Sequence, residues 1–213
     1  MINLRNAPKY FFSTVALSML LFGFNPLATS AVLVSQPYLA NSDGFLSSVN
    51  GGYENAESFV LLGAVNLTSI VWWGSYAGAD DFLVRIGTSL GSWTNLAGTI
   101  AKTATSDFDN ENRDIFRFEQ TLNSVLTLTA DTHFLSISQE TEEWFWTAGS
   151  LDSSFGRLGN FFGVGQDWFS DAAAELSFQL VGERQSQTVP EPGMFALFLM
   201  GIFAFWEGRK RLG

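Results

Sequence analysis

Aromatic side chains are the residues of this 213-residue chain that most directly suggest binding chemistry. Trp72 and Trp73 are adjacent, Tyr76 follows them, and Trp144 and Trp146 stand two positions apart. Exposed indole faces stack on pyranose rings, while nearby amides and carboxylates bind the sugar hydroxyls. Large aromatic residues also fill the cores of β-proteins. The five residues therefore predict either a glycan-binding surface or part of a core.

The spacing of the tryptophans adds a geometric expectation. Alternation along a strand places Trp144 and Trp146 on one side and Phe145 on the other. Adjacent Trp72 and Trp73 point to opposite faces if their segment is a strand. We therefore expect one of these two indoles to lie exposed or at a sheet edge.

An acidic stretch, residues 107–114, offers oxygen ligands at alternate positions. Asp107, Asp109 and Glu111 are the hard ligands that calcium prefers. The EF-hand pattern is not met, because Asn112 stands where Gly is needed and Phe118 where the last Glu is needed. Two interpretations stay open: a calcium-binding loop, or a solvated acidic hairpin loop that binds no metal. No other cofactor is expected.

Residues 87–91 (GTSLG) match the G-x-S-x-G pattern of hydrolase nucleophiles. That pattern needs a helix after the serine, and residues 92–95 do not begin an amphipathic one. The chain has a single histidine, His133, and no cysteine, which excludes thiol catalysis and sites that need two imidazoles. We predict a glycine-rich turn between strands.

Two pairs of adjacent carboxylates, Asp80–Asp81 and Glu142–Glu143, raise the possibility of glycoside cleavage. That reaction needs two carboxyl groups about 5–9 Å apart across a cleft. Neighbours on a strand point apart, so neither pair suffices alone. The sequence therefore predicts no catalytic residue and no enzyme activity.

The elements that position these residues are strands. Apolar residues alternate with polar ones at 82–86, 116–119, 126–129 and 176–180, and glycine-, asparagine- or aspartate-rich turns separate the runs. Many short strands of this kind predict an all-β domain, an antiparallel β-sandwich or jelly roll, over residues 32–182. Between residues 32 and 188 there are 19 acidic and six basic residues. Such a surface repels phosphate backbones, so nucleic acid is not an expected partner.

The N-terminus has the three parts of a signal peptide. Arg5 and Lys9 precede an apolar run at 10–24, and the small residues Thr29 and Ala31 suit cleavage by signal peptidase before Val32. We predict a signal peptide over residues 1–31. The alternative is a retained membrane anchor.

The C-terminus, after a linker that begins at residue 183, has a second three-part pattern. Val189-Pro190-Glu191-Pro192 precedes an apolar run at 194–206, which the basic triplet Arg209-Lys210-Arg211 follows. As a helix this run spans only ~20 Å, short of the ~30 Å hydrocarbon core of a bilayer. The positive-inside rule places the basic end in the cytoplasm. We expect a short transmembrane helix that holds the protein at the inner membrane transiently; a permanent tail anchor is the alternative.

This tail resembles the PEP-CTERM sorting signal of Gram-negative bacteria that make exopolysaccharide. Segments 70–76 (IVWWGSY), 81–86 (DFLVRI) and 176–180 (LSFQL) also resemble the extracellular parts of PEP-CTERM proteins. The resemblance implies recognition of the tail by an exosortase, a membrane-embedded processing enzyme, and a sandwich fold. It implies no known activity for the domain.

Taken together, the sequence predicts an exported protein of the cell envelope or extracellular matrix with a non-enzymatic β-sandwich module. A carbohydrate-binding module that recognises exopolysaccharide is the first alternative. A glycan hydrolase is the second.

Overall fold

The period-two alternation is realised as strands in the computed structural model, which describes residues 30–75, 78, 80–150, 157–161, 168–171 and 174–185. Predictions for residues 1–29, for Tyr76 and for the tail from Val189 to Arg211 lie outside this part of the chain. In the described part the elements are β1 Ala31–Gln36, β2 Gly44–Leu46, β3 Tyr53–Val60, β4 Val65–Ser75, β5 Phe82–Ser89, β6 Ser92–Asn95, β7 Gly98–Phe108, β8 Asp114–Leu128, β9 Thr132–Gln139, β10 Phe145–Thr147, β11 Arg157–Phe161, β12 Phe169–Asp171 and β13 Phe178–Arg184. The described residues contain no helix that is both long and apolar enough to span a membrane.

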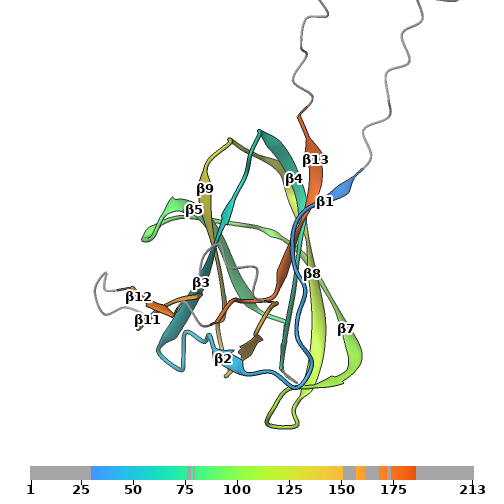
Figure 1. Ribbon diagram of the computed structural model, residues 1–213, viewed down its shortest axis with the longest axis vertical. Helices are drawn as coiled ribbons and strands as arrows, with labels where there is room; N and C mark the ends of the chain where they lie inside the picture. Colours follow the sequence, from blue (N-terminus) through green and yellow to red (C-terminus); the bar gives the residue numbers. More distant parts are fainter. Residues whose placement is uncertain are drawn as a thin grey trace, which may run out of the picture.

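The strands form two antiparallel sheets, which confirms the predicted all-β class (Figure 1). The seven-stranded sheet has β4 at its centre: β8 and then β7 lie on one side, and β13 and then β1 on the other. Beyond Trp72, the short strand β10 takes the place of β13 beside β4, and β2 pairs with the other edge of β10. The six-stranded sheet has the order β12-β11-β3-β9-β5-β6.

The hydrophobic core lies between the two sheets and gives a sandwich-like arrangement. Trp72 of β4 stacks on Phe118 of β8 with ring centroids 5.7 Å apart, and Phe82 of β5 meets both rings from the other sheet. Alternate residues of the facing strands belong to the same cluster, among them Ile70, Val84, Ile86, Leu135, Ile137, Phe178 and Leu180. Period-two patterning thus places one face of each strand inside.

The ends of the domain lie together at one pole. Ala31 of β1 pairs with Gly182 of β13, so β1 begins where β13 ends, at the top of Figure 1. The turns at 61–64 and 129–131 reach the same pole, which we call the tail pole. The opposite pole carries β2, β10 and the β7–β8 turn, and we call it the distal pole. Strand β13 runs to Arg184, two residues beyond the predicted boundary at 182.

Candidate functional site

The interior tryptophans of the predicted glycan-binding set are core residues, which corrects that prediction for them. Trp72, Trp144 and Trp146 are fully buried between the sheets. The indole N–H of Trp146 donates to the carbonyl of Ser177 at 2.8 Å. An indole enclosed by the core offers no face on which a sugar can stack.

Trp73 points to the outer face of its sheet, opposite to Trp72. The expectation that one of the pair is exposed or at a sheet edge is wrong, because β4 lies between β8 and β13. Trp73 is only 7% exposed. The ring of Tyr38, from the segment after β1, stacks on it with centroids 5.4 Å apart. The Tyr38 hydroxyl donates to Asp107 at 2.6 Å, and this hydrogen bond, together with burial, raises the pKa of Tyr38. A contact between distant segments therefore covers the indole.

The acidic stretch forms the β7–β8 turn, and each of its three predicted calcium ligands has a partner within the protein. Asp107 accepts from Tyr38, whereas Glu111 forms an ion pair with Arg113 at 3.2 Å. Asp109 accepts from the Ser75 hydroxyl at 2.7 Å and from Nε of Arg113 at 2.6 Å. Within the described residues no three acidic or histidine side chains are grouped to hold a metal. The calcium interpretation of Asp107, Asp109 and Glu111 is therefore corrected to a hydrogen-bonded hairpin turn.

Asp109 organises this turn. Its carboxylate also accepts from the backbone N–H groups of Glu111 and Arg113 at 3.0 and 2.9 Å. Burial alone would raise its pKa, but the hydrogen bonds from the Arg113 backbone, Ser75 and the Arg113 guanidinium outweigh burial and lower it. The turn is thus built around a buried carboxylate that remains ionised.

The G-x-S-x-G segment is a turn between strands, as predicted. Its first three residues end β5, and Leu90 and Gly91 form the turn to β6; Gly91 has a φ of 87°, a conformation that favours glycine. His133 is buried on β9, stacks on Phe59, and its Nε2 lies 3.0 Å from the carbonyl oxygen of Thr129. The strand-then-helix geometry of a hydrolase nucleophile is not formed here.

The candidate functional site is a groove across the distal pole. Three adjacent pockets of about 240, 440 and 580 Å³ follow one another there. Phe45 lines the first and second pockets, and Phe145 lines the second and third. Neighbouring pockets thus share a phenylalanine side chain, and we call the three pockets together the distal groove.

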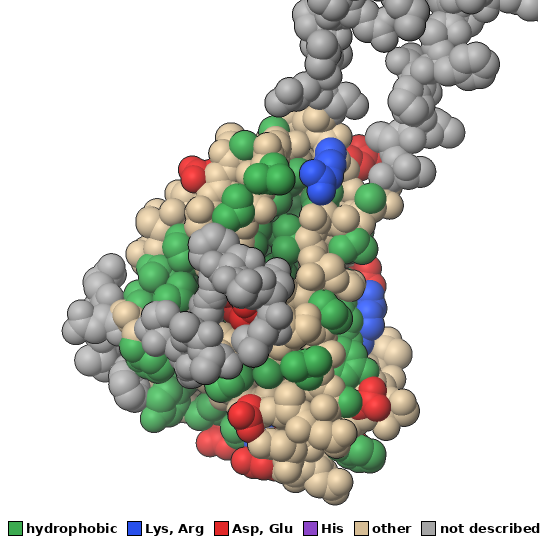
Figure 2. Space-filling view, viewed as in Figure 1, with side chains coloured by type: hydrophobic (Ala, Val, Ile, Leu, Met, Phe, Trp, Pro, Cys, Tyr) green, Lys and Arg blue, Asp and Glu red, His purple; other side chains and the backbone are tan. Residues whose placement is uncertain are grey.

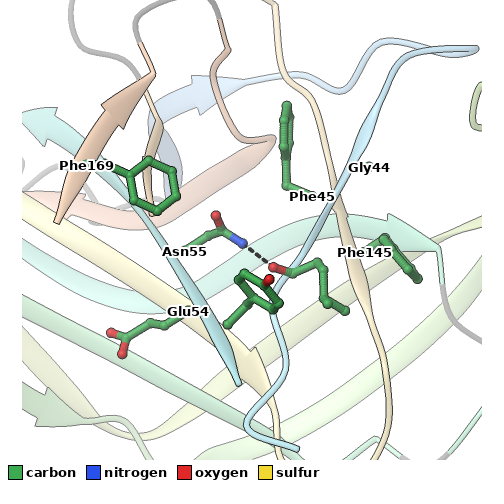
Figure 3. Close-up of a pocket in the computed structure, with 8 residues that line it drawn as sticks. Gly44, Phe45, Glu54, Asn55, Phe145 and Phe169 are labelled. Atoms are coloured by element: carbon green, nitrogen blue, oxygen red, sulfur yellow. Dashed lines mark hydrogen bonds between the residues drawn. The ribbon is translucent and has the colours of Figure 1, made fainter. Parts of the chain in front are cut away.

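Aromatic rings line the central pocket of the distal groove (Figure 3). Tyr53 and Phe169 are 39% and 44% exposed. The side-chain amide of Asn55, which Figure 3 shows among the rings, donates to the carbonyl of Leu46 at 2.6 Å. The pocket therefore combines two exposed aromatic side chains with a buried amide that the Leu46 carbonyl holds in place. Its lining residues are Gly44, Phe45, Leu46, Tyr53, Glu54, Asn55, Phe145 and Phe169.

The largest pocket has an acidic rim. Asp114, Glu142 and Glu143 line it together with Phe145, over whose ring the Arg113 guanidinium lies at 3.7 Å. This cation–π contact fixes the phenyl wall that the two pockets share. The other pair of adjacent carboxylates is Asp80–Asp81. The Asp81 carboxylate accepts a hydrogen bond from the Thr141 hydroxyl at 2.6 Å and so has a structural partner.

A buried ion pair braces the strand behind the central pocket. Arg85 of β5 contacts Glu54 of β3 at 2.5 Å and donates to Ser136 of β9 at 3.0 Å. Burial raises the pKa of Glu54 and lowers that of Arg85, against the attraction between the two groups. The pair ties three adjacent strands together and holds β3 in place.

Sequence reasoning did not single out the rings of the distal groove. Phe45, Tyr53, Phe145 and Phe169 come from four separate strands and share no motif. One signal was available: strand alternation places Phe145 on the face opposite to Trp144 and Trp146, so burial of the two tryptophans leaves Phe145 on the outer face. Comparison with known families, known proteins and solved structures finds no match to this chain.

Proposed function

We propose that this protein is an exported, non-enzymatic β-module that acts in the cell envelope or extracellular matrix and is sorted through its C-terminal tail. The two end segments of the sequence support export: a signal peptide before Val32, and the Val189–Pro192 motif followed by an apolar run and a basic triplet. By resemblance, an exosortase processes the tail while it rests in the inner membrane.

The observation that carries the proposal is the match between these end segments and the domain boundaries. The predicted cleavage site lies at the start of β1, and the tail follows the end of β13 at the same pole. Removal of both segments therefore leaves the strand ladders nearly complete. The distal groove lies at the opposite pole, away from the segment that enters the membrane.

Mass spectrometry of the mature protein from its native host tests this proposal. We expect an N-terminus at Val32 and a C-terminus near Pro190–Pro192. A mature form that still carries Arg209–Gly213 would contradict tail processing, and one that begins at Met1 would contradict signal cleavage.

The distal groove favours a second candidate function, glycan binding. Sugar rings present apolar C–H faces that stack on exposed aromatic rings, and an extended groove suits a chain of several sugars. The carboxylates of Glu142, Glu143 and Asp114 would repel an anionic chain, so a neutral polysaccharide fits best. This candidate uses Phe45, Tyr53, Phe145 and Phe169 rather than the buried tryptophans.

A glycan array separates the two candidates. If the groove binds sugar, Phe145→Ala weakens binding roughly tenfold, since a stacked ring contributes on the order of 1–2 kcal/mol. The control is Phe108→Ala, because Phe108 is an exposed phenylalanine that lines none of the three pockets. An equal loss of glycan affinity in both variants, or no glycan binding by the wild type, would contradict glycan binding by the groove and would support the first candidate function. Release of reducing ends from a bound glycan would instead indicate a hydrolase.

A further inference from the structure

The tail pole exposes apolar side chains that the fold leaves uncovered. Leu62 is 89% exposed at the tip of the β3–β4 turn, which makes it the most exposed large apolar residue of the described chain. Val60 and Val32 are 41% and 52% exposed on strands that reach the same pole. We call these three exposed apolar side chains of the tail pole, Leu62, Val60 and Val32, the apolar tip.

The turn that carries Leu62 is held by hydrogen bonds on both sides. The N–H of Leu61 donates to the carbonyl of Asp131 at 2.9 Å, and the N–H of Gln185 donates to the carbonyl of Ala64 at 2.9 Å. The side chain of Leu61 is buried beneath the turn at 5% exposure. Leu62 therefore projects from an ordered support.

Charge is distributed unevenly between the two poles. Exposed carboxylates gather at the distal pole, whereas the charged residues described at the tail pole include Asp131, Glu183 and the cation Arg184. Cleavage before Val32 would add an α-ammonium group to the tail pole. Figure 2 shows a group of acidic side chains at its lower end, which is the distal pole. The exposed acidic residues at the distal pole include Asp43, Glu111, Asp114, Glu140, Glu142 and Glu143, and Arg113 lies among them.

We propose that the tail pole docks on the bilayer surface, with Leu62, Val60 and Val32 inserted among the lipid headgroups, while the tail holds the protein at the membrane. This inference rests on the proposed membrane residence of the tail. Only eight residues, 186–193, separate Gln185 from the apolar run, so the pole stays within ~30 Å of the bilayer. Repulsion between anionic lipid and the carboxylates of the distal pole favours the same orientation.

A lipid surface suits the tip better than a second protein does. A stable protein interface buries on the order of 800 Å² on each partner, far more than three aliphatic side chains provide. Insertion into the interface needs only a few apolar side chains, because the tail already supplies the anchoring. Docking would present the distal groove outward, away from the membrane.

The cysteine-free chain allows single labels to test the docking. The chain from Val32 to Gly213, with the tail intact, is reconstituted in vesicles of phosphatidylethanolamine and phosphatidylglycerol, with a polarity-sensitive fluorophore on Leu62→Cys, Glu140→Cys or Leu199→Cys. Brominated lipids then report contact with the bilayer by quenching. Residue 62 reports the tail pole, residue 140 the distal pole and residue 199 the tail.

We expect lipid quenching at residues 62 and 199 and none at residue 140. Quenching at residue 199 without quenching at residue 62 would overturn the docking and leave tail insertion intact. If the label at residue 62 is shielded from water but is not quenched by brominated lipid, a second copy of the protein covers it instead. Quenching at 62 but not at 199 would support docking and contradict tail residence, whereas quenching at neither would contradict both.

A second variant separates docking from the properties of the label. With the label on Val60→Cys, the added change Leu62→Ser shifts the equilibrium between docked and undocked protein roughly tenfold toward the undocked state, because a leucine side chain no longer leaves water. The matched change Thr129→Ser, at an exposed polar site of the same pole, leaves that equilibrium unaltered. Equal effects of the two substitutions would overturn the role of Leu62.

Discussion

Asp109 shows how a residue that suggests metal chemistry in the sequence serves the fold instead. Its carboxylate accepts four hydrogen bonds, two from backbone N–H groups and one each from Ser75 and the Arg113 side chain. The Asp109 side chain is fully buried. A calcium ion would compete with these donors for the same oxygens, so the turn is complete without one.

The lowered pKa of Asp109 predicts how its contribution depends on pH. Asp109→Asn should lower the free energy of unfolding by about 2–4 kcal/mol at neutral pH, because it removes a buried charge from its hydrogen-bond donors. A folded-state pKa below the ordinary 3.8 means that this stabilisation is complete above 3.8 and is lost as the pH falls through the folded-state value.

Urea unfolding of both proteins at a series of pH values measures the effect. The gap between wild type and variant should narrow only at pH values below 3.8. A gap that persists unchanged in strong acid would contradict the assignment.

At the scale of the elements, the close pairing of β10 with β4 depends on a glycine. Gly74 of β4 pairs with Phe116 of β8 and with Trp146 of β10, and the Trp144 indole lies directly over its Cα. A Cβ at this position would lie 2.3 Å from Nε1 of Trp144 and 2.6 Å from the carbonyl oxygen of Phe145. Only a glycine allows β10, and with it the Phe145 wall of the distal groove, to approach β4 so closely.

Gly74→Ala should therefore destabilise the protein by about 3 kcal/mol, because neither the indole nor the backbone can move away cheaply. Gly63→Ala is the matched control, since a Cβ there meets nothing within 4 Å. Its effect should stay within about 0.5 kcal/mol. Urea unfolding measures both, and a similar midpoint for the two variants would contradict the packing described for β10.

At the scale of the whole molecule, the first and last described strands meet at the tail pole, and the distal groove lies at the opposite pole. Strand β13 lies between β4 and β1 and ends at Arg184, so it ties the last described segment of the chain to the first. The domain is thereby closed before the tail begins.

Truncation tests this closure. A chain that ends after Gln185 should keep its free energy of unfolding within about 1 kcal/mol of the full chain, because no described strand is shortened. A chain that ends after Leu180 loses the pairs of Val181–Arg184 with β4 and should unfold without a cooperative transition. Thermal unfolding of the two chains, each with residues 1–31 removed, distinguishes the outcomes; equal melting temperatures would contradict a role for the end of β13.

The local sequence pattern determined many of the strands and turns of this protein. Alternation at 82–86, 116–119 and 126–129 predicted strands that the structure contains, and the glycine-rich segment at 87–91 predicted the turn between β5 and β6. Such predictions succeed because the two-residue period of a strand and the backbone freedom of glycine are properties of a few neighbouring residues. The proposed export signals of the two end segments are likewise inferred from local pattern alone.

Only the tertiary structure decided which aromatic rings are covered. Trp73 sits on an outer face, yet Tyr38 from a distant segment covers it, whereas Phe145 remains part of an open groove. The distal groove is assembled from strands β2, β3, β10 and β12, far apart in the sequence. Exposure depends on which segments meet across the fold, and residue type and spacing do not contain that information.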